Sequence, residues 1–178
     1  MKTPPSMLHL VLFAFLCVQA GADELPEKYA PYKKLLGEWD GMVRLVVTSP
    51  SGAEKVDYEK TASCAYDSHR DAIVMVDVEK DPWTKIEVTT TAEIRWDKET
   101  KIFKAMVYAT DGSVRLFVIR ETEGVLRYEH IDGLPGAKFH CEVSIDQKDR
   151  IIEAGQRSWP PPQKTAVEWE VTYSPKAN

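Results

Sequence analysis

"LLGEWDG", residues 35–41, places an indole between two carboxylates and two glycines at the point where the sequence pattern changes. Before it, residues 25–36 carry two prolines and little periodicity, which indicates a short helical or irregular lead-in. After Gly37 the apolar positions follow a period of two, which is typical of strands. The stretch therefore marks the start of a β-rich body, into which Leu35 and Leu36 are expected to pack.

Ten segments beyond this point are rich in alternating, β-branched and aromatic residues, which favours strands. We expect these strands at 38–48, 54–66, 70–79, 84–96, 101–110, 113–122, 124–131, 137–146, 150–158 and 164–173. Asp-Gly at 111–112 is typical of a two-residue hairpin turn, and Asp-Lys-Glu-Thr at 97–100 of a four-residue one. The segment "WPPPQ" at 159–163 cannot continue a strand, because proline lacks the backbone donor, and we interpret it as an exposed connection.

These strands predict an all-β fold. Sequential hairpins favour a closed up-and-down antiparallel meander barrel of about ten strands with a short N-terminal helical segment, because closure leaves no exposed edge. The alternative is an immunoglobulin-like sandwich, but Cys64 and Cys141 are too far apart for its Cys…Trp…Cys spacing. We expect a lead-in with a short helix at 23–36, followed by one barrel domain at 37–176.

Residues 1–22 have the sequence of a secretory signal peptide. An apolar run from Leu8 to Val18 follows Lys2, and Ala20-Gly21-Ala22 offers a small-residue cleavage site. We therefore expect cleavage after Ala22, or alternatively after Ala20, and a secreted or periplasmic protein. No later segment of the sequence is long and apolar enough to predict a membrane span.

The two cysteines that remain after cleavage, Cys64 and Cys141, predict a disulfide in an oxidising compartment. It would close a loop of about 77 residues and contribute about 4 kcal/mol. The alternative is two buried free thiols. A metal site at His140, Cys141 and Glu142 is disfavoured, because consecutive residues on a strand point to opposite faces.

Charge and motifs disfavour several other functions. The net charge is −5 and no basic cluster is interleaved with aromatic residues, which disfavours nucleic-acid binding. The sequence contains no serine-nucleophile elbow, phosphate-binding glycine loop, zinc-binding histidine pair or calcium loop. We therefore assign no catalytic residue, no metal and no cofactor.

The opening stretch resembles the first strand of lipocalin-like (calycin) barrels, in which Gly-x-Trp follows a short N-terminal helix. "IRWDKETKIFKAMVY", residues 94–108, is similar to the mid-barrel hairpin of uncharacterised secreted bacterial members of that superfamily. "VEWEVTYSPK", residues 167–176, is similar to their closing strand. The resemblance implies that Trp39 plugs the barrel floor and that a basic residue packs against it, for which Arg157 is the best positional match.

Rows of apolar side chains on single strands suggest what lines the interior. We expect ligand-binding residues Trp96, Lys104, Met106, Tyr108, Arg115 and Trp169. In this set Lys104 and Arg115 would favour a ligand that carries an acid group. A barrel of this size is either filled by its own side chains or holds one small ligand, and the sequence leaves both open.

The leading hypothesis for function is a carrier or sensor of a small hydrophobic or amphipathic ligand. One alternative is a structural or interaction module of the cell envelope with a filled core, whose protein partner the sequence does not identify. The other is an enzyme of unknown reaction in the barrel mouth.

Overall fold

The computed structural model describes residues 24–131, 136–159 and 164–176, so the predicted signal peptide and the proline run lie outside the described residues. This part of the chain forms a short 3₁₀ helix, η1 (Glu27–Leu35), and ten strands. The strands are β1 (Gly37–Ser49), β2 (Gly52–Asp67), β3 (Ala72–Lys80), β4 (Glu87–Asp97), β5 (Ile102–Ala109), β6 (Val114–Thr122), β7 (Val125–His130), β8 (Lys138–Ile145), β9 (Ile151–Ser158) and β10 (Ala166–Pro175).

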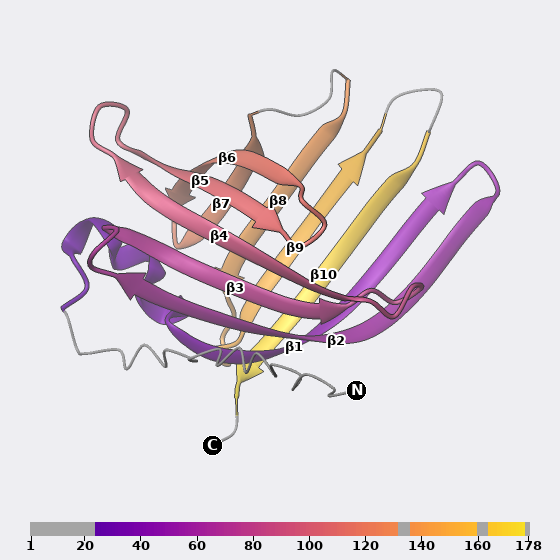
Figure 1. Ribbon diagram of the computed structural model, residues 1–178, viewed down its shortest axis with the longest axis horizontal. Coiled ribbons are helices and arrows are strands. Elements are labelled where there is room, and N and C mark those ends of the chain that lie inside the picture. Colours follow the sequence, from indigo (N-terminus) through magenta and orange to yellow (C-terminus); the bar gives the residue numbers. More distant parts are fainter. Residues whose placement is uncertain (1–23, 132–135, 160–163, 177–178) are drawn as a thin grey trace, which may run out of the picture.

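The strands form one closed barrel. Each strand pairs antiparallel with its neighbours in sequence, and β10 returns to pair with β1 (Figure 1). The closing ladder runs from Trp39 opposite Pro175 to Thr48 opposite Ala166. The predicted all-β meander barrel with a short N-terminal helix is therefore confirmed, and each predicted strand has its counterpart in the structure.

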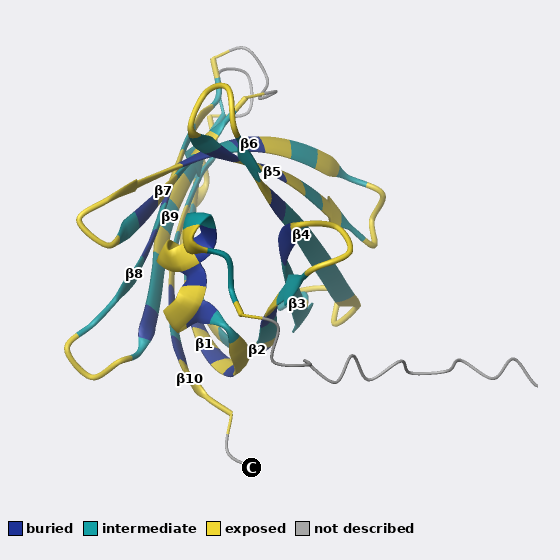
Figure 2. Cartoon of the chain, turned by 90° about the vertical axis from the view of Figure 1, so that its left-hand side faces the viewer, coloured by how far each residue is buried: buried dark blue, intermediate teal, exposed yellow. Residues whose placement is uncertain are grey.

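Helix η1 closes one end of the barrel. Its side chains Tyr29, Tyr32 and Leu35 are buried, and Figure 2 shows the helix lying across this end with its buried residues turned inward. Tyr32 meets the Phe103 ring edge-on with centroids 5.0 Å apart. The Trp39 indole, 8% exposed, donates from Nε1 to the Leu35 carbonyl oxygen over 2.9 Å, which ties the first strand to the last turn of the helix.

The end of the barrel near η1 is densely packed. Ile73, Ile94 and Ile119 have no exposed surface, and they join η1 and Trp39 in one core. Gly41 faces inward on β1 opposite Tyr173, where a Cβ atom would come within 2.9 Å of the tyrosine ring. The lack of a side chain at Gly41 lets this ring complete the floor.

The predicted disulfide is wrong, because Cys64 and Cys141 are both free cysteines. They lie on β2 and β8, and β1, β10 and β9 separate these strands in the barrel wall. Both thiols are buried, and burial raises the pKa of Cys64 to about 12. The two residues contribute to the core as small apolar side chains.

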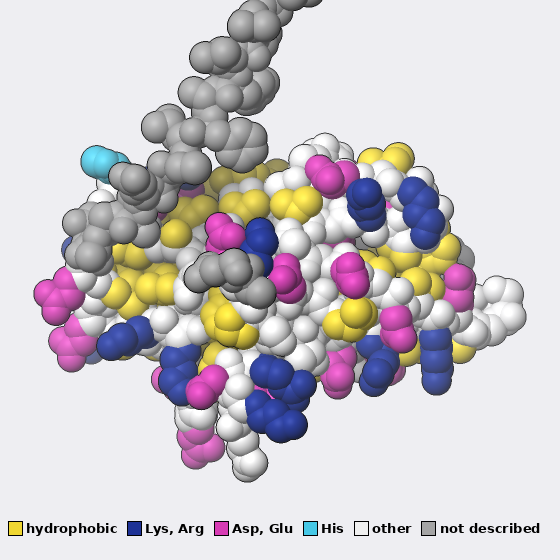
Figure 3. All heavy atoms as spheres, turned by 90° about the horizontal axis from the view of Figure 1, so that it is seen from below, with side chains coloured by type: hydrophobic (Ala, Val, Ile, Leu, Met, Phe, Trp, Pro, Cys, Tyr) yellow, Lys and Arg dark blue, Asp and Glu magenta, His cyan; other side chains and the backbone are white. Residues whose placement is uncertain are grey.

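The outer surface carries both signs of charge. Acidic and basic side chains are interspersed on the face seen in Figure 3. Among the described residues, no helix has the length and apolar character needed to cross a membrane.

Candidate ligand-binding lumen

The lumen is hollow beyond its packed floor. It encloses a cavity of about 410 Å³, lined by the inward rows of the strands. Aliphatic side chains such as Val43, Val107 and Val143 form part of the wall, and aromatic and charged side chains form the rest. A volume of this size is typical of sites that hold one small organic molecule.

A charged cluster lies in the cavity wall on the side of the floor. The Lys60 side chain of β2 is 7% exposed, and its Nζ lies 3.3 Å from Asp77 Oδ2 and 3.6 Å from Glu153 Oε2. The same Nζ lies 5.0 Å from the centre of the Tyr173 ring. Burial by itself lowers the pKa of Lys60, but the neighbouring carboxylates, Glu153 first, raise it further than burial lowers it. Lys60 is therefore a buried ammonium group.

The two carboxylates of this cluster differ in their hydrogen bonds. Glu153 accepts one bond from Trp169 Nε1 at 2.8 Å and one from the Tyr173 hydroxyl at 3.1 Å. Asp77 accepts from Lys60 through Oδ2, while its enclosed Oδ1 has no hydrogen-bond partner among the described residues. Burial raises the pKa of Asp77 despite the nearby Lys60.

Aromatic side chains line the cavity wall together with this cluster. The Trp169 ring occupies the space over Gly155, where a Cβ atom would lie 2.2 Å from the indole. Phe139 lies 5.8 Å from Trp169 and 5.2 Å from Phe117, measured between ring centroids. His130 stacks on Phe117 at 4.9 Å, so it belongs to this aromatic packing.

Two arginines line the cavity at the end away from η1. Arg157 is near the end of β9 and Arg115 near the start of β6, and both alternate inward. The Arg157 guanidinium lies 4.7 Å from the centre of the Trp159 ring. Burial lowers the pKa of Arg157, and the charge of Arg115 lowers it further. Hydrogen bonds from Ser113, and then the charge of Arg115, lower the pKa of the nearby Asp111 carboxyl.

Among the residues predicted from the sequence, Trp169 and Arg115 line the cavity. Trp96 points inward but lies in the floor, 4.9 Å from the Phe103 ring. Arg157 does not lie beside Trp39 as predicted. It is at the opposite end of the barrel, because β9 pairs there with the last residues of the closing ladder.

The expectation that Lys104, Met106 and Tyr108 line the interior is corrected by the structure. These three side chains are exposed on the outer face of β5, and Lys104 pairs with Asp97. The inward row of β5 consists of the alternate residues, with Val107 in the cavity wall. Alternate residues of a strand point to opposite faces, so a shift of one residue in the predicted inward row places every side chain of that row outside.

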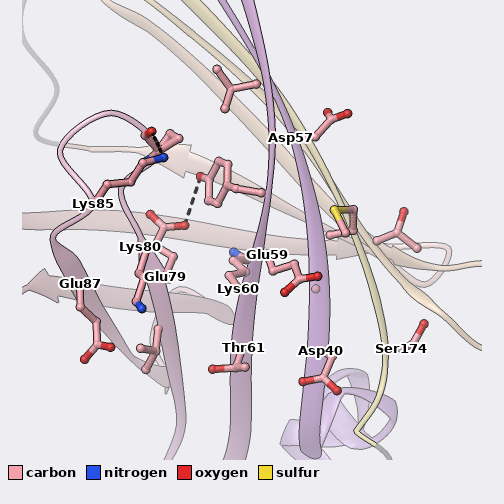
Figure 4. Close-up of a pocket in the computed structure, with 17 residues that line it drawn as sticks. Asp40, Asp57, Glu59, Lys60, Thr61, Glu79, Lys80, Lys85, Glu87 and Ser174 are labelled. Carbon is pink, nitrogen blue, oxygen red and sulfur yellow. Dashed lines mark hydrogen bonds between the residues drawn. The ribbon is translucent and has the colours of Figure 1, made fainter.

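A larger hollow of about 1080 Å³ lies beside β2, where β2 leaves its pairing with β3. Figure 4 shows that its labelled residues are mostly charged, and among them Asp57, Glu59 and Thr61 are exposed residues of β2. The Tyr58 hydroxyl donates to Glu79 over 3.2 Å across the gap, and Lys60 lies beside this contact. This hollow is an open charged groove, whereas the lumen combines aromatic walls with a few converging polar groups, which is typical of a binding site.

The described residues include no group of three or more His, Cys, Asp or Glu side chains placed to hold a metal ion.

Comparison with known proteins bears on the fold. No protein family matches the chain, and no curated protein matches it significantly. A solved structure, the S-type phycobiliprotein lyase CPES from Guillardia theta, superposes with a TM-score of 0.54 at 10% identity, over 83% of this chain and 91% of that chain. A likeness at this identity concerns the fold alone. The closed ten-stranded barrel with its helix-capped floor therefore shares its overall fold with this lyase.

Proposed function

We propose that this protein is a carrier or sensor that holds one small hydrophobic or amphipathic molecule inside its barrel. The observation that carries this proposal is the cavity of about 410 Å³ between the packed floor and the arginines. A core filled by side chains would leave no such space, so the hollow lumen favours the carrier over the structural module. Burial of an apolar ligand here would contribute about 25 cal/mol for each Å² removed from water.

A binding role also suits the nucleophilic side chains near the lumen. The Cys141 thiol lines the cavity, but burial raises its pKa far above neutrality, so it is held as the unreactive thiol. The signal-peptide sequence at residues 1–22 supports a secreted or periplasmic location for this carrier. N-terminal sequencing of the protein from its own host, with fractionation of the cells, tests that location. A mature chain that begins at Asp23 is expected, and a chain that retains residues 1–22 would contradict secretion.

The binding proposal is tested by native mass spectrometry of the protein purified from its own host, and by titration with a dye that fluoresces in apolar surroundings. A bound small molecule is expected in the first experiment and saturable dye binding in the second. The variant Ala92→Phe fills the lumen and is expected to abolish dye binding, because Ala92 is part of the cavity wall. Its matched control is Thr91→Phe, which adds the same side chain at the next position of β4, on the opposite face.

Circular dichroism should show that both phenylalanine variants remain folded. Dye binding that survives Ala92→Phe but is lost in Thr91→Phe would place the ligand outside the lumen. The absence of both a co-purifying molecule and saturable binding would contradict the carrier function.

A further inference from the structure

The charges that face the lumen are separated along the barrel axis. Lys60 pairs with Gly41, close to the start of β1, whereas Arg157 pairs with Val167, opposite the end of β1. The cluster of Lys60, Asp77 and Glu153 thus lies toward the floor, and the arginine pair lies toward the mouth. Glu153 and Arg157 share one face of β9 four residues apart, so their Cα atoms are about 13 Å from each other.

The mouth has an excess of positive charge. Arg115 and Arg157 both line the cavity, and the charge of Arg115 lowers the pKa of Arg157. The Asp111 carboxylate lies near Arg115, so these three groups together carry one net positive charge. Two neighbouring guanidiniums repel each other unless an anion lies between them. Guanidinium donors also match the geometry of a carboxylate or phosphate. This end of the cavity is therefore complementary to an anionic group.

The floor side of the cavity has an excess of negative charge. Lys60 is one base among three acids, because Glu79 lines the same cavity as Asp77 and Glu153. Both oxygens of Glu153 already accept hydrogen bonds. Asp77 Oδ1 accepts none, and rotation about the soft terminal torsion of aspartate exchanges its two oxygens. Asp77 lines the cavity, so its carboxyl group can accept a hydrogen bond from a ligand. A second acid group of a ligand would be repelled at this position.

We propose that the ligand is an amphiphile with a single acid group, bound with this group between Arg115 and Arg157 and with a hydrogen-bond donor, such as an amine or hydroxyl, directed at Asp77. The apolar body lies between the two ends against the aromatic band of Trp169, Phe139 and Phe117. This inference rests on the proposed carrier function and adds the chemical class and the orientation of the ligand.

The test compares ligands that differ at one end only, by displacement of the fluorescent dye. The probes are dodecanoate, methyl dodecanoate, ω-aminododecanoate and dodecanedioate. We expect methyl dodecanoate to bind at least tenfold more weakly than dodecanoate, because it lacks the anion. We expect dodecanedioate to bind at least tenfold more weakly than ω-aminododecanoate, because its second acid faces the carboxylates near the floor.

Substitutions of the arginines and of Asp77 test which residues cause each ligand preference. Arg115→Gln and Arg157→Gln should remove the preference for acid over ester, while Arg120→Gln, on the outer face of β6 beside Glu129, should retain it. Asp77→Asn should narrow the preference for ω-aminododecanoate over dodecanedioate. Should that variant not fold, Glu153→Gln removes the same excess negative charge.

The outcomes separate this inference from the function on which it rests. Equal binding of ester and acid, or of diacid and amino acid, would overturn the proposed ligand class while the carrier function stands. Failure of every probe and of the dye to bind the wild-type protein would overturn both.

Discussion

The Trp169 indole lies over the backbone of Gly155 on the neighbouring strand, and its Nε1 donates to Glu153 two residues away. The glycine gives the ring its place, and the carboxylate fixes its orientation. One wall of the lumen therefore depends on a position that has no side chain.

We predict that Gly155→Ala displaces this indole, because a Cβ atom would lie 2.2 Å from it. The expected loss of unfolding free energy is about 1–3 kcal/mol, as for other overpacked cores. Chemical denaturation measures this loss. The displacement of the indole is followed by the fluorescence of Trp169, which is obtained by subtracting the spectrum of a Trp169→Phe variant. The control Ala154→Val changes the adjacent exposed residue and should alter stability by less than about 0.5 kcal/mol. Equal effects of the two variants would contradict the close packing of Trp169 on Gly155.

The barrel floor should depend strongly on Trp39. Trp39→Ala removes a buried indole and its hydrogen bond to Leu35, and we expect a loss of about 3–5 kcal/mol in unfolding free energy. Trp83 provides the matched control, since it is 47% exposed and Trp83→Ala should cost less than about 1 kcal/mol. Thermal and chemical unfolding both report the difference. Similar losses for the two tryptophans would show that Trp39 does not anchor the floor.

The pH dependence of stability should reveal the partly buried carboxyl of Asp77, whose side chain is 28% exposed. Because burial raises its pKa, its contribution to stability is fully present below the unfolded value of about 3.9 and is lost as pH rises through the folded value. We therefore expect the unfolding free energy of Asp77→Asn, relative to wild type, to increase as pH rises from about 4. Denaturant titrations at a series of pH values measure this difference.

The contribution of Asp97 to stability should depend on pH in the opposite direction. Its hydrogen bond from Lys104 and those from the backbone of the 97–100 turn lower its pKa to about 2, so its contribution is present above the unfolded pKa and is lost as pH falls toward 2. Asp97→Asn should therefore lose stability relative to wild type as pH rises from about 2 to 4. If the unfolding free energies of Asp77→Asn and Asp97→Asn, relative to wild type, changed with pH in the same direction, the opposite pKa shifts of the two carboxyl groups would be contradicted.

The thiols of Cys64 and Cys141 should be protected in the folded protein. Burial raises the pKa of both, so we expect neither to react with iodoacetamide at pH 8 under native conditions, and both to react in concentrated guanidinium chloride. Peptide mapping by mass spectrometry locates the modification. Recovery of a linked Cys64–Cys141 peptide from unreduced protein would contradict the structure.

Much of the fold could be predicted because period-two patterns and turn sequences are local. The aromatic row of β10 has its counterpart in the structure. A turn also forms at Asp111–Gly112, but it is longer than the predicted two-residue turn, because Ala109 N donates to the Ser113 carbonyl oxygen. The candidate site was less predictable. A charged residue within an inward row, such as Lys60 or Glu153, was the available signal, but its meaning depends on which face of the strand is inside.

Sequence by itself determined the strands, their order and the place of Trp39 at the start of the first one, because hydrophobic alternation and turn chemistry are properties of short stretches. Only the tertiary structure decided the inward faces, the separation of Cys64 from Cys141 and the hollow between acids and arginines. Those features follow from ladder register and barrel closure, which bring together residues far apart in the chain.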